Sequence, residues 1–350
     1  MQIAIDIREA CRQKKAGKGQ WLAGFLSELI SRNHQLLFLT DNEVPSSLIT
    51  DSVNIKKLPS GPFWHIFASS YLKKQSDILY VSPTSTLVPC LLRGKIPVAL
   101  VVHDLIAFQN EPHDKKAKWI ERTTLKYALN KSEYIFTVSE STKNDLLSRF
   151  SKDNLNSVNT IYAGPLTKHI NINSSNSKTI VCPATLCPRK NQLRLIKAFN
   201  LLPDNLRDEY KLILIGARGW NDSNIIKLAE CSKSVEWLNY VSDDEYERYL
   251  NECSTLALPS LYEGFGMQIL DALQRGIPVL TSSRGSLKEI VGNAASLVDP
   301  ERIEDISTGL RQILTDEKLR NRLKQEGPIQ AEQFSWKRTV DIFLSTVEKV

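Results

Sequence analysis

The sequence predicts an α/β protein with two doubly wound domains, and three observations support this fold class. The chain has 350 residues, which exceeds the usual size of one hydrophobic core, so two domains are expected. Short apolar runs alternate with longer amphipathic stretches, as in parallel sheets that carry helices on both faces. The alternation pauses at residues 164–178, a polar stretch with clustered Asn and Ser that is typical of a linker.

The first domain is expected over residues 1–165. Its predicted strands are, in chain order, Ile3–Ile7, Gln35–Leu39, Ile78–Val81, Val98–Val102 and Tyr134–Val138. The helices predicted between them include Trp21–Ser31, Lys115–Leu129 and Glu140–Ser148. Each predicted strand is a short, mostly apolar run, which suits a strand buried on both faces of a parallel sheet.

The second domain is expected over residues 166–333, and the C-terminal helix, about 334–350, is expected to return to the first domain. The predicted strands are Thr179–Pro183, Tyr210–Ile215, Val235–Leu238, Thr255–Leu258, Pro278–Thr281 and Ala295–Leu297. The predicted helices are Gln192–Leu201, Asn224–Cys231, Asp243–Glu252, Met267–Arg275 and Leu287–Val291. Parallel strands bind ligands at their carboxyl ends, so a cleft between the two domains is the expected site.

Composition narrows the range of partners. The net charge of +6 suits an anionic ligand or a membrane surface, but it is too small and diffuse to predict a nucleic-acid partner. No stretch of eighteen apolar residues predicts a membrane span, and the first residues resemble a buried strand rather than a signal peptide. The six cysteines form no CxxC pair, so we expect reduced thiols in a cytoplasmic protein and no metal site.

Two carboxylates, Glu263 and Asp271, flank a glycine-rich turn in the stretch PSLYEGFGMQILDALQRGIPVL, residues 259–280. Gly264 and Gly266 permit backbone angles that are closed to other residues and let a ligand approach the chain closely. The helix expected from Met267 onward would present free N–H groups and the positive end of its dipole, which favour a phosphate.

The two acids have a functional and a structural interpretation. Asp271 lies about one turn inside the expected helix, where its carboxylate could accept the hydroxyls of a ribose while a diphosphate caps the helix. Glu263 could reach a sugar beyond that diphosphate. From the spacing alone, an ordinary loop acid and a solvated helix acid are the alternative.

This stretch resembles the signature of the retaining family 4 glycosyltransferases, in which two glutamates stand eight positions apart around an EGFG sequence. Here the pattern is Glu263-Gly-Phe-Gly-Met-Gln-Ile-Leu-Asp271. Aspartate replaces the usual second glutamate and is one methylene shorter, so ribose binding there is expected to be looser.

Further segments resemble the same family along nearly the whole chain. They are AGKGQW at 16–21, VHDL at 102–105, TVSESTKNDLL at 137–147, CPRKNQLRLIKAF at 187–199, SLKEIVGNAASLVDP at 286–300 and FSWKRTVDIF at 334–343. The resemblance implies the GT-B fold, in which two Rossmann-like domains face a central cleft. It also implies an acceptor-binding first domain and a second domain that binds the nucleotide sugar.

The resemblance implies roles for three side chains besides Glu263. Arg189 and Lys190 would stabilise the leaving nucleoside diphosphate, so neither a metal nor a cofactor is expected; without the family context, a solvated basic turn is the simpler interpretation. His103 would contact the donor sugar from the carboxyl end of a strand, with a buried core histidine as the alternative. The remaining histidines, residues 34, 65, 113 and 169, are interpreted as structural.

Gly17 and Gly19 could bring backbone N–H groups to a phosphate, although a flexible turn is the alternative. With Gly264, Phe265, Gly266 and Met267, they complete the expected donor site. Leu22 stands where a dinucleotide site would have its third glycine, so NAD binding is not expected.

A basic stretch in the first domain, made of Lys115, Lys116, Lys118, Trp119, Arg122 and Lys126, could rest on an anionic membrane or meet a lipid-diphosphate acceptor. A solvated helix face is the alternative. Four nearby aromatic side chains are expected either in the core or along an acceptor groove: Phe63, Trp64, Phe67 and Tyr71.

The sequence therefore predicts a retaining hexosyltransferase that uses a nucleoside-diphosphate sugar and a glycan or lipid-linked acceptor in surface polysaccharide synthesis. Segments 16–21 and 286–291 favour GDP-mannose weakly among the donors. The protein is expected in the cytoplasm, and a peripheral place on the inner face of the membrane is compatible with the basic stretch. The alternatives are a catalytically silent relative that binds a nucleotide or a partner protein, and a nucleotide-sugar epimerase.

Overall fold

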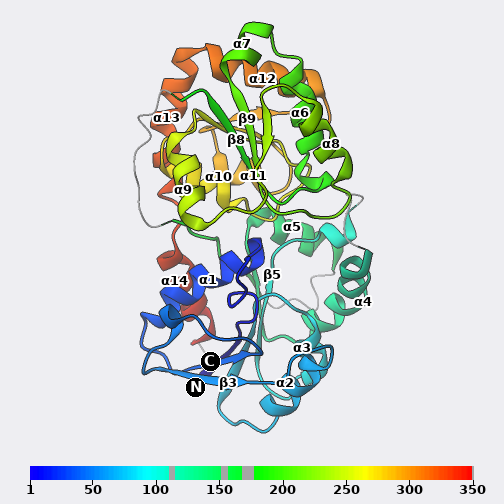
Figure 1. Cartoon of the computed structure of the whole chain (residues 1–350). Helices are drawn as coiled ribbons and strands as arrows, with labels where there is room; N and C mark the ends of the chain where they lie inside the picture. The colour runs from blue at the N-terminus through cyan, green and yellow to red at the C-terminus, as the bar shows by residue number, and fades with distance from the viewer. Residues whose placement is uncertain (110–114, 151–156, 168–176, 349–350) are drawn as a thin grey trace. The chain divides into compact units, whose positions relative to one another are not determined.

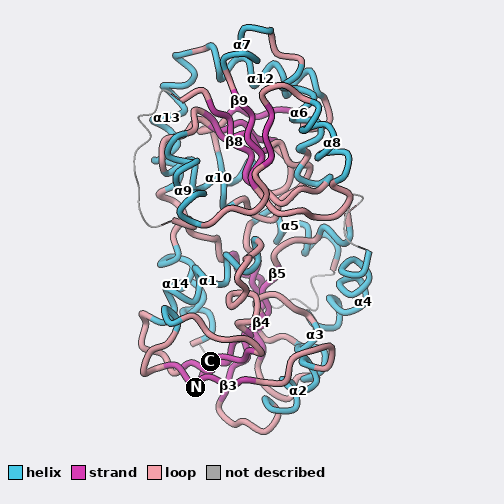
Figure 2. Tube along the Cα trace, in the orientation of Figure 1, coloured by secondary structure: helices cyan, strands magenta, loops and turns pink. Residues whose placement is uncertain are grey.

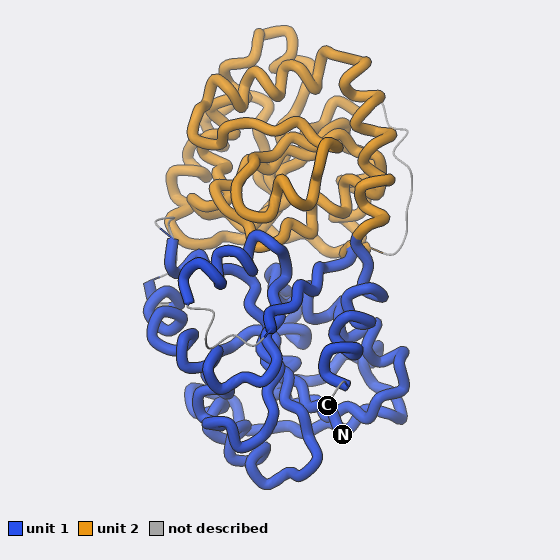
Figure 3. Tube along the Cα trace, turned by 180° about the vertical axis from the view of Figure 1, so that it is seen from behind, with its two compact units in different colours: residues 1–164, 334–350 blue, residues 165–333 orange. Residues whose placement is uncertain are grey.

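The computed structural model describes residues 1–109, 115–150, 157–167 and 177–348. The chain divides into two compact units (Figure 3), of which unit 1 is Met1–Gly164 with Phe334–Val350 and unit 2 is Pro165–Gln333. The boundary expected between residues 165 and 166 lies one residue from this division. Each unit is a parallel sheet enclosed by helices, as Figure 2 shows for the strands and the helices around them.

Unit 1 is built on a seven-stranded sheet in the order β3-β2-β1-β4-β5-β6-β7, with every pair parallel. The strands are β1 (Gln2–Asp6), β2 (Leu36–Thr40), β3 (Val53–Lys57), β4 (Ile78–Ser82), β5 (Val98–Val102), β6 (Tyr134–Thr137) and β7 (Val158–Thr160). The strand order reverses between β1 and β4, and such a reversal opens a crevice at the carboxyl ends of the strands.

The helices of unit 1 cover both faces of this sheet (Figure 1). They are α1 (Gly17–Ile30), α2 (Trp64–Leu72), α3 (Leu87–Leu92), α4 (Lys115–Lys131), α5 (Glu140–Arg149) and α14 (Trp336–Val347). On one face, α2 and α3 pack into a core cluster with β1, β2 and β4 that includes the fully buried Trp64 and Tyr80.

The C-terminal helix α14 belongs to unit 1 and lies beside α1 (Figure 1). The Phe343 ring is fully buried, with its centroid 5.2 Å from that of Phe25. Trp336 packs edge-on against Trp21 at 6.0 Å. The expected return of this helix to the first domain is therefore confirmed.

Unit 2 is built on a six-stranded parallel sheet in the order β10-β9-β8-β11-β12-β13. The strands are β8 (Thr179–Pro183), β9 (Lys211–Ile215), β10 (Val235–Trp237), β11 (Thr255–Leu258), β12 (Val279–Ser282) and β13 (Ser296–Val298). The helices are α6 (Gln192–Asn200), α7 (Asp204–Glu209), α8 (Ser223–Cys231), α9 (Asp243–Glu252), α10 (Met267–Gln274), α11 (Leu287–Val291), α12 (Ile303–Thr315) and α13 (Glu317–Ala331). Here the order reverses between β8 and β11.

Two strands of unit 1, β3 and β7, were not predicted from the sequence, and both lie at the edges of the sheet. In β3 all residues after Val53 are exposed, so the strand lacks the apolar run that marks the inner strands. β7 is three residues long. Across the described residues, no helix is both long and apolar enough to cross a membrane.

Candidate functional site

In unit 2, the loops that follow β8 and β11 meet at the carboxyl ends of these strands. Asn191 joins them: it adopts a left-handed φ of 63°, and its side-chain amide donates to the carbonyls of Pro259 (2.9 Å) and Pro300 (2.7 Å). The Leu261 N–H also donates to the carbonyl of Arg189, at 2.8 Å. Arg189 and Lys190 are thereby held against the loop that carries Glu263.

The structure brings Glu263, Arg189 and Lys190 together in one ion cluster. One carboxylate oxygen of Glu263 lies 2.6 Å from Lys190 Nζ, and the other lies 2.8 Å from a guanidinium nitrogen of Arg189. The Glu263 side chain is 7% exposed, Lys190 11% and Arg189 25%. Both cations thus contact the same carboxylate.

The two cations also set the protonation state of Glu263. Burial alone would raise the pKa of this carboxyl, but the positive charges of Lys190 and Arg189 outweigh burial and lower the pKa to about 2. Glu263 is therefore ionised at neutral pH. Arg189 donates in addition to the carbonyl of Tyr262, at 2.8 Å, which fixes the guanidinium at the loop.

The glycine-rich loop after Glu263 is tied to the segment that precedes α11. Gly266 has a φ of 111° and begins α10, and Ser286 Oγ donates to the carbonyls of Glu263 (3.1 Å) and Phe265 (2.8 Å). Gly285, with a φ of 58°, lies so close that a Cβ would stand 2.4 Å from the Glu263 carbonyl oxygen. The side chains of Phe265 and Met267 are buried, whereas Gly264 is half-buried, so Gly264 is the more accessible part of this loop.

Asp271 lies on α10, as predicted, but the structure does not support the expected ribose contact. Its side chain is fully buried, and one carboxylate oxygen accepts the backbone N–H groups of Leu166 (2.8 Å) and Thr167 (3.4 Å). The carboxylate therefore holds the start of unit 2 and has no exposed atom for a ligand. Burial raises the pKa of Asp271 to about 7, although these N–H groups oppose the shift.

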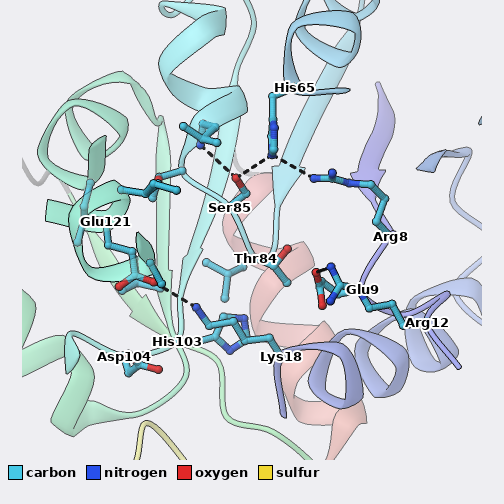
Figure 4. Close-up of a pocket in the computed structure, with 17 residues that line it drawn as sticks. Arg8, Glu9, Arg12, Lys18, His65, Thr84, Ser85, His103, Asp104 and Glu121 are labelled. Atoms are coloured by element: carbon cyan, nitrogen blue, oxygen red, sulfur yellow. Dashed lines mark hydrogen bonds and ion pairs between the residues drawn. The ribbon is translucent and has the colours of Figure 1, made fainter. Parts of the chain in front are cut away.

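A second candidate feature is a pocket of about 380 Å³ in unit 1, at the carboxyl ends of β1, β4 and β5 (Figure 4). This location is the crevice that the strand-order reversal between β1 and β4 predicts. Its polar lining residues are Arg8, Glu9, Arg12, Lys18, His65, Thr84, Ser85, Thr86, His103, Asp104 and Glu121.

His103 lines this pocket from the end of β5, as its sequence position predicts. Its Nε2 lies 2.7 Å from the carbonyl oxygen of Pro83, an acceptor, so Nε2 carries the proton and Nδ1 keeps its lone pair. The ring also packs edge-on against Trp21, with centroids 5.2 Å apart. Burial and then the charge of Lys18 lower the pKa of His103 to about 4, so the ring is neutral at pH 7.

Gly17 and Gly19 lie in the first turn of α1 and not in a flexible turn, which corrects one interpretation of the sequence. The two positions differ in their surroundings. A Cβ at Gly19 would stand 2.5 Å from the carbonyl oxygen of Glu9, whereas a Cβ at Gly17 would have nothing within 4 Å. Gly19 thus lets α1 pack closely on the chain that follows β1.

Several pocket residues were not predicted from the sequence. Lys18 Nζ lies 3.5 Å from a carboxylate oxygen of Glu121, and His65, which was interpreted as structural, lies 3.2 Å from Arg8. Arg8 follows β1 directly, so its position at a strand end was the available signal. Lys18 had a signal too, since it stands between the two glycines. His113 and His169 lie outside the described residues.

The expected site residues thus fall into two groups. Unit 2 brings together Glu263, Arg189, Lys190 and the loop from Gly264 to Met267. Unit 1 carries His103, Gly17 and Gly19. Among the residues that the structure describes, no group of three or more His, Cys, Asp or Glu side chains is arranged to hold a metal ion.

Comparison with known proteins finds a family similarity around the ion cluster. Residues 167–330, nearly all of unit 2, match the family model of glycosyl transferases group 1. Unit 2 is therefore similar to the group 1 glycosyl transferases. The glycine-rich loop and the ion cluster of Glu263 both lie within the matched region.

Among the relatives of this chain is O-antigen chain mannosyltransferase B of Escherichia coli, which is 41% identical over 155 residues. That match covers 43% of this chain and 41% of the relative, so it extends over less than half of either protein.

Solved structures show the fold over the full length. Sucrose-phosphate synthase of Thermosynechococcus elongatus superposes with a TM-score of 0.81 at 16% identity, covering 99% of this chain and 98% of its own. HepE of Anabaena, in complex with UDP-glucose, gives a TM-score of 0.77 at 16% identity and covers all of both chains. The predicted fold class, two Rossmann-like α/β domains of the GT-B type, is thereby confirmed.

Proposed function

We propose that the chain is a retaining glycosyltransferase that moves a hexose from a nucleoside-diphosphate sugar to a hydroxyl of a glycan or lipid-linked acceptor. One observation carries the proposal: within the unit that matches the group 1 model, Arg189 and Lys190 lie together against the carboxylate of Glu263 at the carboxyl ends of two strands. This adjacent pair of cations suits the diphosphate of a nucleotide sugar, because an arginine fork and a lysine point charge both bind phosphate oxygens.

The chemistry would proceed on one face of the sugar. As the bond from the anomeric carbon to the diphosphate oxygen breaks, negative charge grows on the diphosphate, and Arg189 and Lys190 would stabilise that charge. The acceptor hydroxyl would form the new bond from the same face and pass its proton to the departing phosphate. Glu263 would keep both cations in place and orient the donor sugar. With the cations in these roles, no metal ion is required.

A mannosyl donor and a surface polysaccharide acceptor are the specific form of the proposal. The O-antigen chain mannosyltransferase among the relatives supports both, although the match covers 41% of that protein. GDP-mannose is therefore the first donor to test, and UDP-sugars follow because the HepE structure contains UDP-glucose.

A surface of α4 supports a place at an anionic membrane, where the protein would meet a lipid-linked acceptor. We define the basic face of α4 by the exposed residues Lys115, Trp119, Arg122 and Lys126, which recur every three or four positions. Trp119 is 68% exposed. Lys118 of the predicted set is only half-exposed and donates to the carbonyl of Gln109, and the side chain of Lys116 lies outside the described ones.

Co-sedimentation with vesicles tests this membrane contact. The protein should sediment with vesicles that contain phosphatidylglycerol and stay in solution with pure phosphatidylcholine vesicles, and Trp119→Ala with Lys126→Glu should reduce sedimentation several-fold. Equal behaviour of the variant and the unaltered protein would contradict a role for the basic face of α4.

Nucleotide binding and turnover test the proposed function. Thermal shifts with GDP, UDP, ADP and dTDP identify the nucleotide, because a ligand that binds the native state alone raises the melting temperature. The matching nucleotide sugar should then release nucleoside diphosphate when a mannose-containing acceptor is present, with or without EDTA. Nucleotide binding without transfer would favour a silent relative, and release of free sugar or epimer without an acceptor would favour an epimerase.

A further inference from the structure

Helix α2 of unit 1 exposes an apolar stripe on its outer side. Phe63, at the N-cap, and Ile66 and Phe67, in the first turn, are 63%, 48% and 43% exposed. These positions are three and four residues apart, so their side chains lie together on one side of the helix. The opposite side, with the fully buried Trp64 and Leu72, packs into the core. We call Phe63, Ile66 and Phe67 the apolar stripe of α2.

The exposure of this stripe corrects one expectation from the sequence, which placed four aromatic side chains in the core or along an acceptor groove. Trp64 lies in the core and Tyr71 packs against it. Phe63 and Phe67 are exposed instead, and neither lines the pocket of unit 1. Large apolar side chains gathered on one exposed surface are typical of an interaction site, because their contact with water is unfavourable.

The charged residues around the stripe are basic. Residues 52–76 contain no acidic residue, whereas three exposed lysines lie beside α2. Lys73 and Lys74 follow its C-terminal end, and Lys56 of β3 lies with its Nζ 5.2 Å from the centre of the Tyr71 ring. An apolar stripe beside lysines is complementary to an anionic lipid surface, because the apolar side chains can reach the acyl chains while the ammonium groups meet the headgroup phosphates.

Helices α2 and α4 cover the same face of the unit 1 sheet, with α3 between them (Figure 1). Strand β5 shows this, because alternate residues of a strand point to one face. Val98 packs in the core cluster with α2 and α3, and Leu100 and Val102 pack in the cluster with α4. The apolar stripe of α2 and the basic face of α4 are on exposed sides of these helices, so both belong to the same side of unit 1.

We propose that the apolar stripe of α2 inserts into an anionic membrane, at the boundary between headgroups and acyl chains, while the basic face of α4 meets the headgroups. This inference rests on the membrane contact of the proposed function and adds a second element to it. The two elements differ in physical nature. The α4 lysines and arginine attract anionic lipids electrostatically, which salt screens, whereas the α2 stripe binds through apolar burial, which salt does not screen.

Vesicle binding by the full chain at two salt concentrations tests the inference, with phosphatidylglycerol and phosphatidylcholine in equal amounts. We expect the unaltered protein to bind at low salt and to keep part of this binding at about 1 M NaCl, where the Debye length falls to ~3 Å. The double variant Phe63→Gln with Ile66→Gln should bind at least ~10-fold more weakly at low salt, the size of a 1.4 kcal/mol difference. It should also lose the binding that remains at high salt.

Three results would overturn the inference: no binding of the unaltered protein, its complete release at high salt, or an unchanged affinity of the double variant. Loss of the fold would not explain a weaker affinity, because both replaced side chains are exposed. The melting temperature of the double variant should therefore equal that of the unaltered protein.

The double variant Leu201→Gln with Ile329→Gln is the matched control. These two apolar side chains are exposed to a similar degree, 58% and 67%, but belong to unit 2. The control should bind vesicles as the unaltered protein does, and an equal loss in both double variants would overturn a specific role of α2. Sedimentation velocity without lipid tests a second copy of the chain as the occupant. If the unaltered protein is a dimer and the α2 variant a monomer, the stripe is an interface between copies and the inference is overturned.

The failure of this inference and the failure of the proposed function give different results. If nucleotide-sugar turnover is present and the α4 variant alone loses vesicle binding, only this inference fails. If the α2 variant loses vesicle binding but the unaltered protein turns over no nucleotide sugar, the transferase proposal fails and a membrane-binding protein remains.

Discussion

Glu263 illustrates how one side chain joins stability to the proposed chemistry. Its carboxylate lies within 2.8 Å of both cations, and its pKa falls to about 2. A carboxyl with a lowered pKa in the folded state stabilises the protein above its ordinary pKa near 4.5 and loses this contribution as the pH falls toward 2. Part of the acid sensitivity of unit 2 therefore originates at this residue.

Replacing Glu263 with glutamine tests that contribution. Because two largely buried cations lose their counter-charge, Glu263→Gln should lower the free energy of unfolding at pH 7 by about 3 kcal/mol. The loss should shrink as the pH falls from about 4.5 toward 2, since the native carboxyl is then protonated too. Urea unfolding between pH 2.5 and 7 measures it, and a penalty independent of pH would contradict the ionised cluster.

Asp271 should give the opposite pH dependence in the same unit. Its folded pKa of about 7 exceeds the ordinary value of 3.8, so the folded state binds more protons between these values and stability falls as the pH rises through that range. Asp271→Asn keeps an acceptor for the Leu166 and Thr167 N–H groups and should remove this slope between about pH 4 and 7. An identical slope in the variant would show that Asp271 does not titrate in that range.

At the scale of elements, the start of α1 decides how closely the helix packs on the segment after β1. The pair Gly17 and Gly19 was expected to serve a phosphate, but the structure gives a packing reason at Gly19 alone. The sequence shows that both positions are glycine. It does not show that a Cβ at Gly19 would stand 2.5 Å from the Glu9 carbonyl oxygen, because that approach depends on the tertiary structure.

The two glycines form a matched pair of variants. Gly19→Ala should destabilise unit 1 by about 1–3 kcal/mol, because its methyl group meets backbone rather than a movable side chain. Gly17→Ala has open space and should stabilise α1 slightly, by up to about 1 kcal/mol. Thermal unfolding monitored by circular dichroism compares them, and equal effects of the two substitutions would contradict the described packing.

The elements that the sequence predicted well are the buried strands and the helices that cover them. Val98–Val102, Thr179–Pro183 and Thr255–Leu258 have the predicted bounds, since an uninterrupted apolar run marks a strand buried on both faces. The edge strands Val53–Lys57 and Val158–Thr160 lacked that signal.

The same limit applied to the site. The family resemblance indicated Glu263, Arg189 and Lys190, but the ion pairs among them and the inward contact of Asp271 depend on chain segments far apart in the sequence.

At the scale of the whole molecule, the C-terminal segment belongs to unit 1, because α14 returns there after the chain has completed unit 2. Phe343 lies between Phe25 and Phe136, at 5.2 Å from each ring, and is fully buried. The stability of unit 1 therefore depends on residues at the other end of the chain.

Calorimetry of two single-residue variants, Phe343→Ala and Ser345→Ala, tests this dependence. Phe343→Ala should destabilise unit 1 by about 3–5 kcal/mol and lower the transition assigned to it, because a buried ring is removed. Ser345→Ala, on the exposed side of the same helix, should leave the transition in place. If Phe343→Ala leaves all transitions unchanged, α14 is not part of the unit 1 core.

The cations beside Glu263 are proposed to stabilise a leaving diphosphate. The most direct measurement is kcat/KM for sugar transfer by Lys190→Ala, compared with Lys197→Ala, which removes an exposed lysine of α6. We expect kcat/KM to fall about 10²-fold or more in Lys190→Ala, because this is the usual cost of removing one group that stabilises transition-state charge. Lys197→Ala should keep a near-normal kcat/KM. If Lys190→Ala keeps a kcat/KM within about threefold of the unaltered protein, the proposed role of Lys190 is contradicted. Such a change is well short of the tenfold that 1.36 kcal/mol of barrier represents.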